Sequence, residues 1–266
     1  EPRVERLTPA EARAFTPVLR EGEGAISGAL LDRHARKLDA HAMLEAHRKE
    51  LLARGGKLAN GAPVERLARA GERWTADTPG ASYAARVVVN AAGAWADTVA
   101  QMGGIAALGI TPLRRTVITF DVPIDVTGWP FTKTVGPGFY IEPEGAGRLL
   151  ACPMDEGISA PCDAQPEDED VARAAWAVEQ ATTLTIPRLA SKWAGLRSFT
   201  PDRLPIASFD SHAPDFFWLA GQGGFGLQTS PAMALAAEAL VTRSAWPGEL
   251  RAVSVRPEDL SLMRLN

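Results

Sequence analysis

Three arginines carry the side chains best suited to bind an acidic ligand. Arg114 and Arg115 follow Pro112-Leu113, and Arg197 has apolar or small neighbours and no acidic residue within three positions. A guanidinium in such surroundings needs a counter-anion, and its planar fork binds a carboxylate through two parallel hydrogen bonds. For any single arginine, a solvated surface charge or a distant carboxylate partner is the alternative. Tyr140 is one of two tyrosines and is consistent with an amphipathic strand residue at the rim of a core.

A second candidate is the glycine-rich stretch 221–226, Gly-Gln-Gly-Gly-Phe-Gly. It matches the pattern G-x-G-x-x-G between an expected strand and an expected helix, as a dinucleotide site requires. However, no second strand ends in an acidic residue about 20 positions further on to bind a ribose. What remains is a set of backbone N–H groups near a helix N-terminus, which suits an anionic or electron-rich group. A tight turn without any ligand is the alternative.

Other chemistries find no support in the sequence. There is no G-x-S-x-G motif, and neither Cys152 nor Cys162 has a plausible base nearby. His41 and His47 are six residues apart, which does not place them on one helix face. We therefore expect no metal site and no hydrolytic nucleophile.

Composition excludes several classes of protein. The chain has 266 residues, 46% of them hydrophobic, which is typical of packed globular domains. With 28 basic and 32 acidic residues the net charge is -4, so nucleic acid is not an expected partner. No apolar run reaches the ~18 residues of a spanning helix, and the two cysteines suggest reduced thiols. We expect a cytoplasmic protein.

The elements that must position the candidate residues differ along the chain. Helical spacing predicts a helix over 39–54, ended by Gly55-Gly56. A strand over 85–90 contains Val87-Val88-Val89, typical of a buried parallel strand, and leads into small residues that allow close approach of a ligand. Short strand-like stretches after about residue 105 (116–122, 139–143 and 148–153) predict an antiparallel sheet in a second domain.

The last third of the chain predicts two helices and a strand. The acidic run 167–170 suits the first turn of a helix with Ala174 and Val178 on its apolar side. Residues 216–220 predict a buried strand. Ser230-Pro231 predict the N-cap and first position of a helix that continues to about Arg243.

Four motifs in order resemble the FAD-dependent D-amino-acid oxidase family. They are Val87–Asp97 (VVVNAAGAWAD), Pro112–Arg115 (PLRR), Trp193–Asp202 (WAGLRSFTPD) and Phe217–Ser230 (FWLAGQGGFGLQTS). Within the family, the chain is most similar to the bacterial D-arginine dehydrogenase type, through 179–186 and the Gln-Gly-Gly-aromatic-Gly loop. The resemblance extends from about Pro17 to Val241.

The resemblance implies a fold with α/β and α+β character, the C-terminal portion of a two-domain FAD-dependent oxidoreductase. It implies a partial Rossmann-like FAD/NAD(P)-binding domain over 38–104 and 198–266, and a mixed-sheet substrate domain over 1–37 and 105–197. In such enzymes a hydride passes from the α-carbon of an amino acid to the flavin, and the imino acid formed hydrolyses to a keto acid and ammonia. The protein supplies orientation and electrostatics.

The resemblance also implies roles for individual residues. Arg115 and Arg197 correspond to a pair that binds the substrate carboxylate, and Tyr140 to a hydroxyl-bearing partner. The cofactor-binding positions that it implies are Val64, Ala92, Gly93, Gly223, Gly224, Phe225, Gly226, Leu227 and Gln228. Of these, the loop from Gly223 is expected to direct its backbone toward the flavin ring, where negative charge grows on reduction.

One part of the family pattern is not found. In the family the G-x-G-x-x-G motif lies at the extreme N-terminus, in a first βαβ unit, and we expect this sequence to begin after that unit. The expectation carries two consequences: weakened FAD affinity, and self-association through an exposed sheet edge.

Three functional hypotheses follow. The first is a D-amino-acid dehydrogenase or oxidase of amino-acid catabolism, with FAD as cofactor and oxygen or a quinone as acceptor. The second keeps the flavin but changes the substrate to glycine, sarcosine or a 2-hydroxy acid. The third is a non-catalytic fragment or partner subunit that binds no flavin alone. Contact with a subunit or a membrane surface is left open by the sequence.

Overall fold

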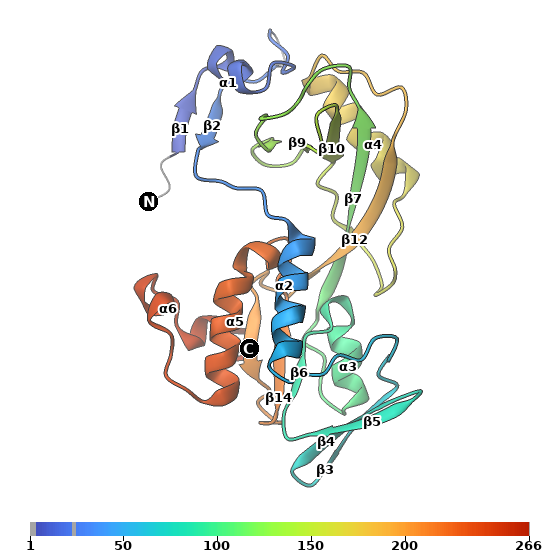
Figure 1. Ribbon diagram of the computed structural model, residues 1–266, viewed down its shortest axis with the longest axis vertical. Coiled ribbons are helices and arrows are strands. Elements are labelled where there is room, and N and C mark those ends of the chain that lie inside the picture. Colours follow the sequence, from blue (N-terminus) through green and yellow to red (C-terminus); the bar gives the residue numbers. More distant parts are fainter. Residues whose placement is uncertain (1–3, 23–24, 266) are drawn as a thin grey trace. The chain divides into compact units, whose positions relative to one another are not determined.

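The computed structural model describes residues 4–22 and 25–265, which divide into two compact units (Figure 1). Unit 1 comprises the described residues of Glu1–Lys37, Arg114–Gly157 and Asp163–Leu196, and unit 2 those of Leu38–Leu113, Ile158–Cys162 and Arg197–Asn266. None of the helices in the described ranges combines the length and apolar character needed to cross a bilayer.

A six-stranded sheet forms the centre of unit 1. Its strands are β7 (Thr111–Asp121), β8 (Thr132–Lys133), β9 (Tyr140–Pro143), β10 (Arg148–Cys152), β11 (Gly157–Ile158) and β12 (Ser191–Phe199). The order is β11-β7-β10-β9-β8, with β12 also paired to β7. The β7–β10, β10–β9 and β8–β9 pairs are antiparallel, which confirms the antiparallel sheet predicted for the middle of the chain.

The two faces of this sheet have different surroundings because side chains alternate along a strand. On one face Ile118 and Phe120 are completely buried in a core that includes Ala174 and Val178. Ala174 and Val178 belong to helix α4 (Asp168–Ala181). This helix begins after Glu167 and has three acidic residues in its first turn, as predicted. The opposite face carries a smaller cluster of Val117, Leu150 and Cys152, with Tyr140 packed against it.

A two-stranded sheet and a short helix complete unit 1. Strands β1 (Val4–Leu7) and β2 (Ala29–Asp32) pair antiparallel. Helix α1 (Pro9–Phe15) lies between them in sequence, with Thr8 as N-cap and Pro9 at its start. The Thr8 hydroxyl accepts from the Glu11 amide while the Glu11 carboxylate accepts from the Thr8 amide, forming a capping box.

Unit 2 contains two three-stranded sheets. The first has the order β13 (Ile206–Phe209), β14 (Phe216–Ala220), β6 (Val88–Asn90), and the second is β3 (Arg66–Ala70), β4 (Arg73–Thr78), β5 (Ala81–Ala85). The helices of the unit are α2 (Ala40–Ala53), α3 (Ala96–Met102), α5 (Gly226–Thr242) and α6 (Gly248–Ala252), and the 3-10 helices are Gly93–Trp95, Pro257–Leu260 and Leu262–Leu265.

The strand β14 lies at the centre of the hydrophobic core of unit 2. Phe216 and Trp218 pack on one side with Trp74, and Phe217 packs on the other side with Met233 and residues of α5. The Trp74 and Phe216 rings lie 5.7 Å apart. All three β14 aromatic side chains are completely buried, which confirms the prediction of a buried strand over 216–220.

Residues 85–90 form less strand than predicted. The structure has a separate strand β5 up to Ala85, and β6 comprises only 88–90. β6 is parallel to β14, as predicted, but Val89 remains 45% exposed because β6 is the edge strand of its sheet in the described part of the chain. The expectation that the valine run is buried is therefore wrong: Val89 is exposed, and Val87 and Val88 are only partly buried.

Helix α5 begins five residues earlier than predicted. It starts at Gly226, and Pro231 lies inside it. Proline has no amide hydrogen to donate to the Leu227 carbonyl, but the Ser230 hydroxyl donates to that carbonyl at 2.9 Å. Ser230 therefore compensates the proline inside the helix and does not act as the N-cap.

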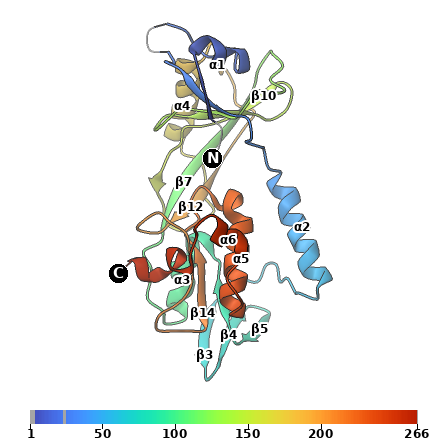
Figure 2. The same ribbon diagram turned by 90° about the vertical axis from the view of Figure 1, so that its left-hand side faces the viewer.

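Helix α2 confirms the helix predicted over 39–54, with Asp39 as its N-cap. None of its residues is buried, and its ribbon stands apart from the sheets and the other helices of unit 2 in Figure 2. Leu44 is 65% exposed, and Leu51 and Leu52 are also exposed. The spacing of the apolar residues thus predicted the helix correctly. Its apolar side, however, is not buried by any part of the described chain.

Candidate functional site

Two loops of unit 2 leave the same edge of its sheet. Because β6 and β14 are parallel, with Asn90 opposite Trp218, their carboxyl ends lie side by side. The turn at 92–93 follows β6, and residues 221–226, which we call the glycine loop, follow β14. Ligands of open sheets bind beyond the carboxyl ends of parallel strands. The structure therefore brings together two segments that the sequence marked independently.

The turn after β6 is fixed by a buried asparagine. The Asn90 side chain donates to the Ala96 carbonyl at 2.8 Å and accepts from the Ala92 amide at 3.3 Å. Asn90 is only 2% exposed, so these bonds are shielded from water. Gly93 has a φ of 57°, which favours glycine. Ala92 and Gly93 were predicted as cofactor-binding positions but Asn90 was given no role, although an asparagine at the end of an apolar strand is a usable signal.

The glycine loop packs closely against β12. Gly223 has a φ of 53°, and a Cβ atom there would collide with the Phe199 ring. A Cβ atom at Gly224 would lie 2.6 Å from Nη1 of Arg197. The Gly223 amide donates to the Ser198 carbonyl at 2.9 Å. Glycine is therefore required by geometry at Gly223, and the close contact places the Arg197 guanidinium against the loop.

Arg197 is a partly buried cation beside this loop. It belongs to unit 2 and forms no ion pair with any residue in 4–22 or 25–265. The loop leads directly into α5, whose N-terminus has no side-chain cap. A guanidinium and the positive end of a helix dipole thus lie at neighbouring positions, which favours an anionic or electron-rich ligand.

The remaining cofactor-binding candidates lie in the same unit. Phe225 and Leu227, at the start of α5, are 63% and 51% exposed. Gly226 and Gln228 belong to the first turn of this helix. Val64 lies before β3 and packs against the core around Trp74.

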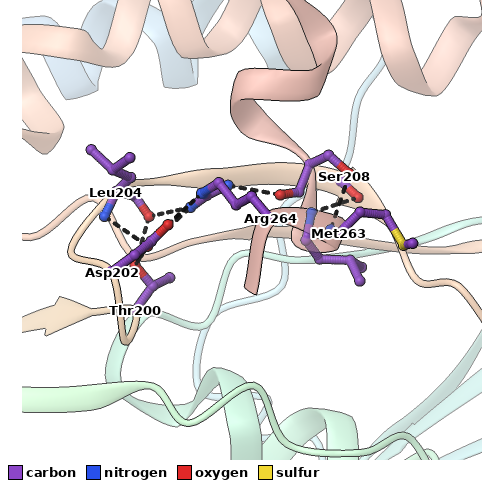
Figure 3. Close-up of polar contacts among 8 residues, drawn as sticks. Thr200, Asp202, Leu204, Ser208, Met263 and Arg264 are labelled. Atoms are coloured by element: carbon purple, nitrogen blue, oxygen red, sulfur yellow. Dashed lines mark hydrogen bonds and ion pairs between the residues drawn. The ribbon is translucent and has the colours of Figure 1, made fainter. Parts of the chain in front are cut away.

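A turn after β12 is held by hydrogen bonds among Thr200, Asp202, Leu204 and Arg264 (Figure 3). The Asp202 carboxylate accepts from the Thr200 hydroxyl at 2.8 Å and from Nε of Arg264 at 2.7 Å. Arg264 also donates to the Leu204 carbonyl at 2.6 Å. A Cβ atom at Gly221 would lie 2.6 Å from Cγ2 of Thr200, so the turn and the loop are in contact. Arg264 lies far from the motifs in sequence, and nothing in the sequence pointed to it.

The ionisation of Asp202 follows from these contacts. Burial alone would raise the pKa of this carboxyl, but hydrogen bonds from Arg264, the Leu204 amide and Thr200 outweigh it. The net effect lowers the pKa of Asp202 below its ordinary value. The carboxylate is therefore held in its charged form next to Arg264.

Unit 1 presents its candidate residues on the sheet face opposite α4. Tyr140 on β9 lies opposite Cys152 on β10, and both pack with Val117 on β7. Arg115 is two residues before Val117, so strand alternation places it on the same face. The Phe131 ring lies 4.9 Å from the Tyr140 ring. Burial raises the pKa of the Cys152 thiol, which therefore stays protonated.

The structure distinguishes the two adjacent arginines. Arg114 lies on the α4 side, where it pairs with Glu167 at 2.5 Å and with Asp170 at 3.8 Å. Arg115, on the opposite face, has a side chain 11% exposed and pairs with Glu156 at 3.3 Å. Arg115 thus has a distant carboxylate partner, one of the alternatives for an isolated arginine, and the sequence analysis did not identify Glu156.

The candidate residues do not all belong to one unit. Arg115 and Tyr140 are in unit 1, whereas Arg197, Val64, the turn at 92–93 and the glycine loop are in unit 2. Among the residues that the structure describes, no three His, Cys, Asp or Glu side chains are arranged to hold a metal ion.

Comparison with known proteins gives a family and a fold. The family described as FAD dependent oxidoreductase (DAO) matches residues 1–240. Glycine oxidase from Geobacillus kaustophilus is similar, with 24% identity and a TM-score of 0.77 over 95% of this chain and 66% of its own. L-proline dehydrogenase from P. horikoshii has 21% identity and a TM-score of 0.79, over 96% and 71% respectively. L-amino acid deaminase from Proteus vulgaris has 14% identity and a TM-score of 0.76, over 99% and 71%. The chain thus spans about two thirds of the length of these solved chains, and at such identities the likeness concerns the fold.

Proposed function

Because the chain belongs to the DAO family of FAD dependent oxidoreductases, we propose that it oxidises the C–N bond of an amino acid, with D-amino acids as preferred substrates. The preference for the D-configuration, and the likeness to the D-arginine dehydrogenase type, rest on the four sequence motifs alone. As in the sequence analysis, we assign the flavin to unit 2 and substrate recognition mainly to unit 1.

The observation that carries this proposal is the position of Arg197. Its guanidinium lies against Gly224, in the loop between a central strand and the uncapped N-terminus of α5. A partly buried arginine without an ion pair in the described chain stabilises a bound carboxylate strongly, because the bound anion supplies the missing partner.

The chain's own residues fit a flavin at the edge of the unit 2 sheet. Glycine at Gly223 keeps the loop clear of side chains, so its main chain can approach a planar ring closely. We propose that Ala92, Gly93, Val64 and the residues Gly223–Gln228 hold FAD. When bound, FAD supplies the acceptor for the hydride that leaves the substrate α-carbon.

We propose that the remaining residues bind and orient the substrate. Arg115 and Arg197 bind the α-carboxylate, and the Tyr140 hydroxyl forms a further hydrogen bond to it. This holds the α-carbon in a fixed orientation, which lowers the entropic part of the barrier. The buried side chains of Val117, Leu150 and Cys152, against which Tyr140 packs, exclude water from this face of the sheet and strengthen ionic contacts there.

A titration of the purified chain with FAD, followed by anaerobic additions of candidate substrates, tests the proposal. We expect a protein-bound flavin spectrum that D-amino acids bleach and that L-amino acids, sarcosine and 2-hydroxy acids bleach more slowly. Fast bleaching by sarcosine or a 2-hydroxy acid alone would instead support the second hypothesis.

The non-catalytic alternative is favoured by one observation, the span of only about two thirds of the solved chains. A cooperatively folded chain that stays colourless with excess FAD would support that alternative and contradict our proposal.

A further inference from the structure

The connection from β10 to β11 leaves a gap beside the continuous strand β7. Both β10 and β11 pair with β7, but the residues between them, 153–156, belong to no strand. Within this connection Met154 has a φ of 53°, in the left-handed region that residues other than glycine rarely adopt. Interruptions of a ladder and strained backbone are both frequent next to functional sites, where they redirect a side chain. The residue of β7 that faces this gap is therefore of interest.

A buried carboxylate occupies the gap. The register of β10 with β7 ends at Ala151 opposite Ile118, two residues short of Thr116. There the two carboxylate oxygens of Asp155 accept from the Thr116 amide at 2.9 and 3.0 Å. Asp155 and Thr116 are both buried, so water does not replace this contact. The side chain of Asp155 thus satisfies a buried main-chain donor at the place where the neighbouring strand is missing.

This contact fixes the main chain next to Arg115. The Thr116 N–H and the Arg115 carbonyl belong to one planar peptide unit, so Asp155 holds the orientation of that unit. The orientation in turn determines the direction in which the Arg115 side chain leaves the strand. The guanidinium is largely buried, and its Nε has no hydrogen-bond partner within residues 4–22 and 25–265. The direction of the side chain therefore decides whether this donor can reach a ligand.

We propose that Asp155 is a positioning residue, which orients Arg115 for the carboxylate of the substrate. The inference rests on the proposed function, because it takes Arg115 as a carboxylate-binding residue. Asp155 itself touches neither substrate nor flavin and acts only through the main chain of β7. A carboxylate forms a stronger bond to an amide than a neutral carbonyl does, so it holds the peptide unit more firmly than an ordinary strand partner.

A double-mutant cycle on the full chain with FAD tests this role. The probes are propionate and propanamide, two ligands of similar shape of which only propionate is charged. Their dissociation constants are measured by ligand-observed NMR for wild type, Arg115→Ala, Asp155→Ala and the double variant. Glu179→Ala is a matched control, because the Glu179 carboxylate in unit 1 also accepts from a main-chain amide, that of Ile186 at 2.7 Å.

We expect Arg115→Ala to weaken propionate binding at least about tenfold and Asp155→Ala to weaken it about fivefold, while propanamide binding changes little. In the double variant the loss should equal that of Arg115→Ala alone, because a positioning residue acts only through the arginine that it positions. Asp155→Asn retains one acceptor for the Thr116 amide and should lie between wild type and Asp155→Ala. Glu179→Ala should keep both dissociation constants.

Two results would overturn the inference and leave the proposed function standing. One is a loss in the double variant that equals the product of the two single losses, and the other is wild-type propionate binding in both Asp155 variants, each with the Arg115→Ala effect present. An Asp155→Asn chain that does not fold would show that the residue maintains the fold as a whole, and would also overturn the inference. If Arg115→Ala leaves propionate binding unchanged, the carboxylate assignment in the proposed function fails together with this inference.

Discussion

The candidate residues of the two units are held in place by different means. In unit 2 the site is made of main chain: the glycine loop and the turn at 92–93 are shaped by close contacts of Gly223 with Phe199 and by the buried Asn90. In unit 1 it is made of side chains, Arg115 and Tyr140, which strand alternation places on one face of a sheet. A substitution that adds a side chain should therefore impair the main-chain site of unit 2. A substitution that removes a charge or a hydroxyl group should impair the side-chain site of unit 1.

The largest effect is expected from removing charge. Arg197→Ala should lower kcat/KM for amino acids about 10²–10³-fold, because a partly buried contact to the substrate carboxylate is lost. Arg115→Ala should act similarly, and neither should unfold the protein. Steady-state kinetics check this, with Arg54→Ala at the C-cap of the exposed helix α2 as control. Wild-type kinetics in both arginine variants would remove the basis for the carboxylate assignment.

The second effect is expected from added bulk in the main-chain site. Gly223→Ala should destabilise unit 2 by about 2 kcal/mol, from backbone strain and a collision with Phe199, and should weaken FAD binding. Gly80→Ala is the control, since a Cβ atom there meets nothing within 4 Å. Denaturant unfolding and FAD titration measure the two effects. Equal stability of the two variants would mean that the glycine loop is not packed as described.

A substitution in the turn after β12 should change the free energy of unfolding less than Gly223→Ala does. Arg264→Met removes the bonds to Asp202 and Leu204 and should cost about 1–2 kcal/mol at neutral pH. Because the folded-state pKa of Asp202 is lowered, its contribution is full above the unfolded-state value of about 3.9 and is lost as the pH falls through the folded value. The difference between wild type and variant should therefore narrow in acid, which unfolding curves at several pH values test. A constant difference down to acidic pH would contradict the ionic part of this account.

The smallest effect on stability is expected outside both candidate regions. Leu44→Gln on α2 should change the free energy of unfolding by less than about 0.5 kcal/mol, because the side chain is already largely exposed. It should nevertheless reduce the self-association that we predict from the exposed apolar residues of α2 and the edge strand β6. Sedimentation velocity measures this. A wild-type chain that is monomeric at high concentration would contradict the predicted self-association.

The sequence predicted the elements whose signals are local. The acidic start of α4 and the apolar strand β14 are visible in a few adjacent residues, and the structure has both of them. The start of α5 was predicted wrongly, because a Ser-Pro pair is also compatible with a helix interior when the serine satisfies the free carbonyl.

Contacts between distant residues were not predictable in this way. Glu156 is 41 positions from Arg115, and Arg264 is 62 positions from Asp202. Each pair depends on strand register or on the path of the chain, and neither leaves a pattern in one sequence. The family resemblance marks its positions through residue types that recur in motifs, and their roles stay predictions. It assigns no role to Asn90, whose buried hydrogen bonds fix the turn after β6.

Anaerobic reduction of the flavin tests the central claim most directly. The purified chain is loaded with FAD and mixed with a D-amino acid, and the absorbance of oxidised flavin is followed for wild type and for Arg197→Ala. The account predicts rapid bleaching in wild type, and bleaching at least a hundredfold slower in the variant at subsaturating substrate, about 3 kcal/mol of lost transition-state stabilisation. Bound flavin that no amino acid bleaches, or that bleaches equally fast without Arg197, would contradict it.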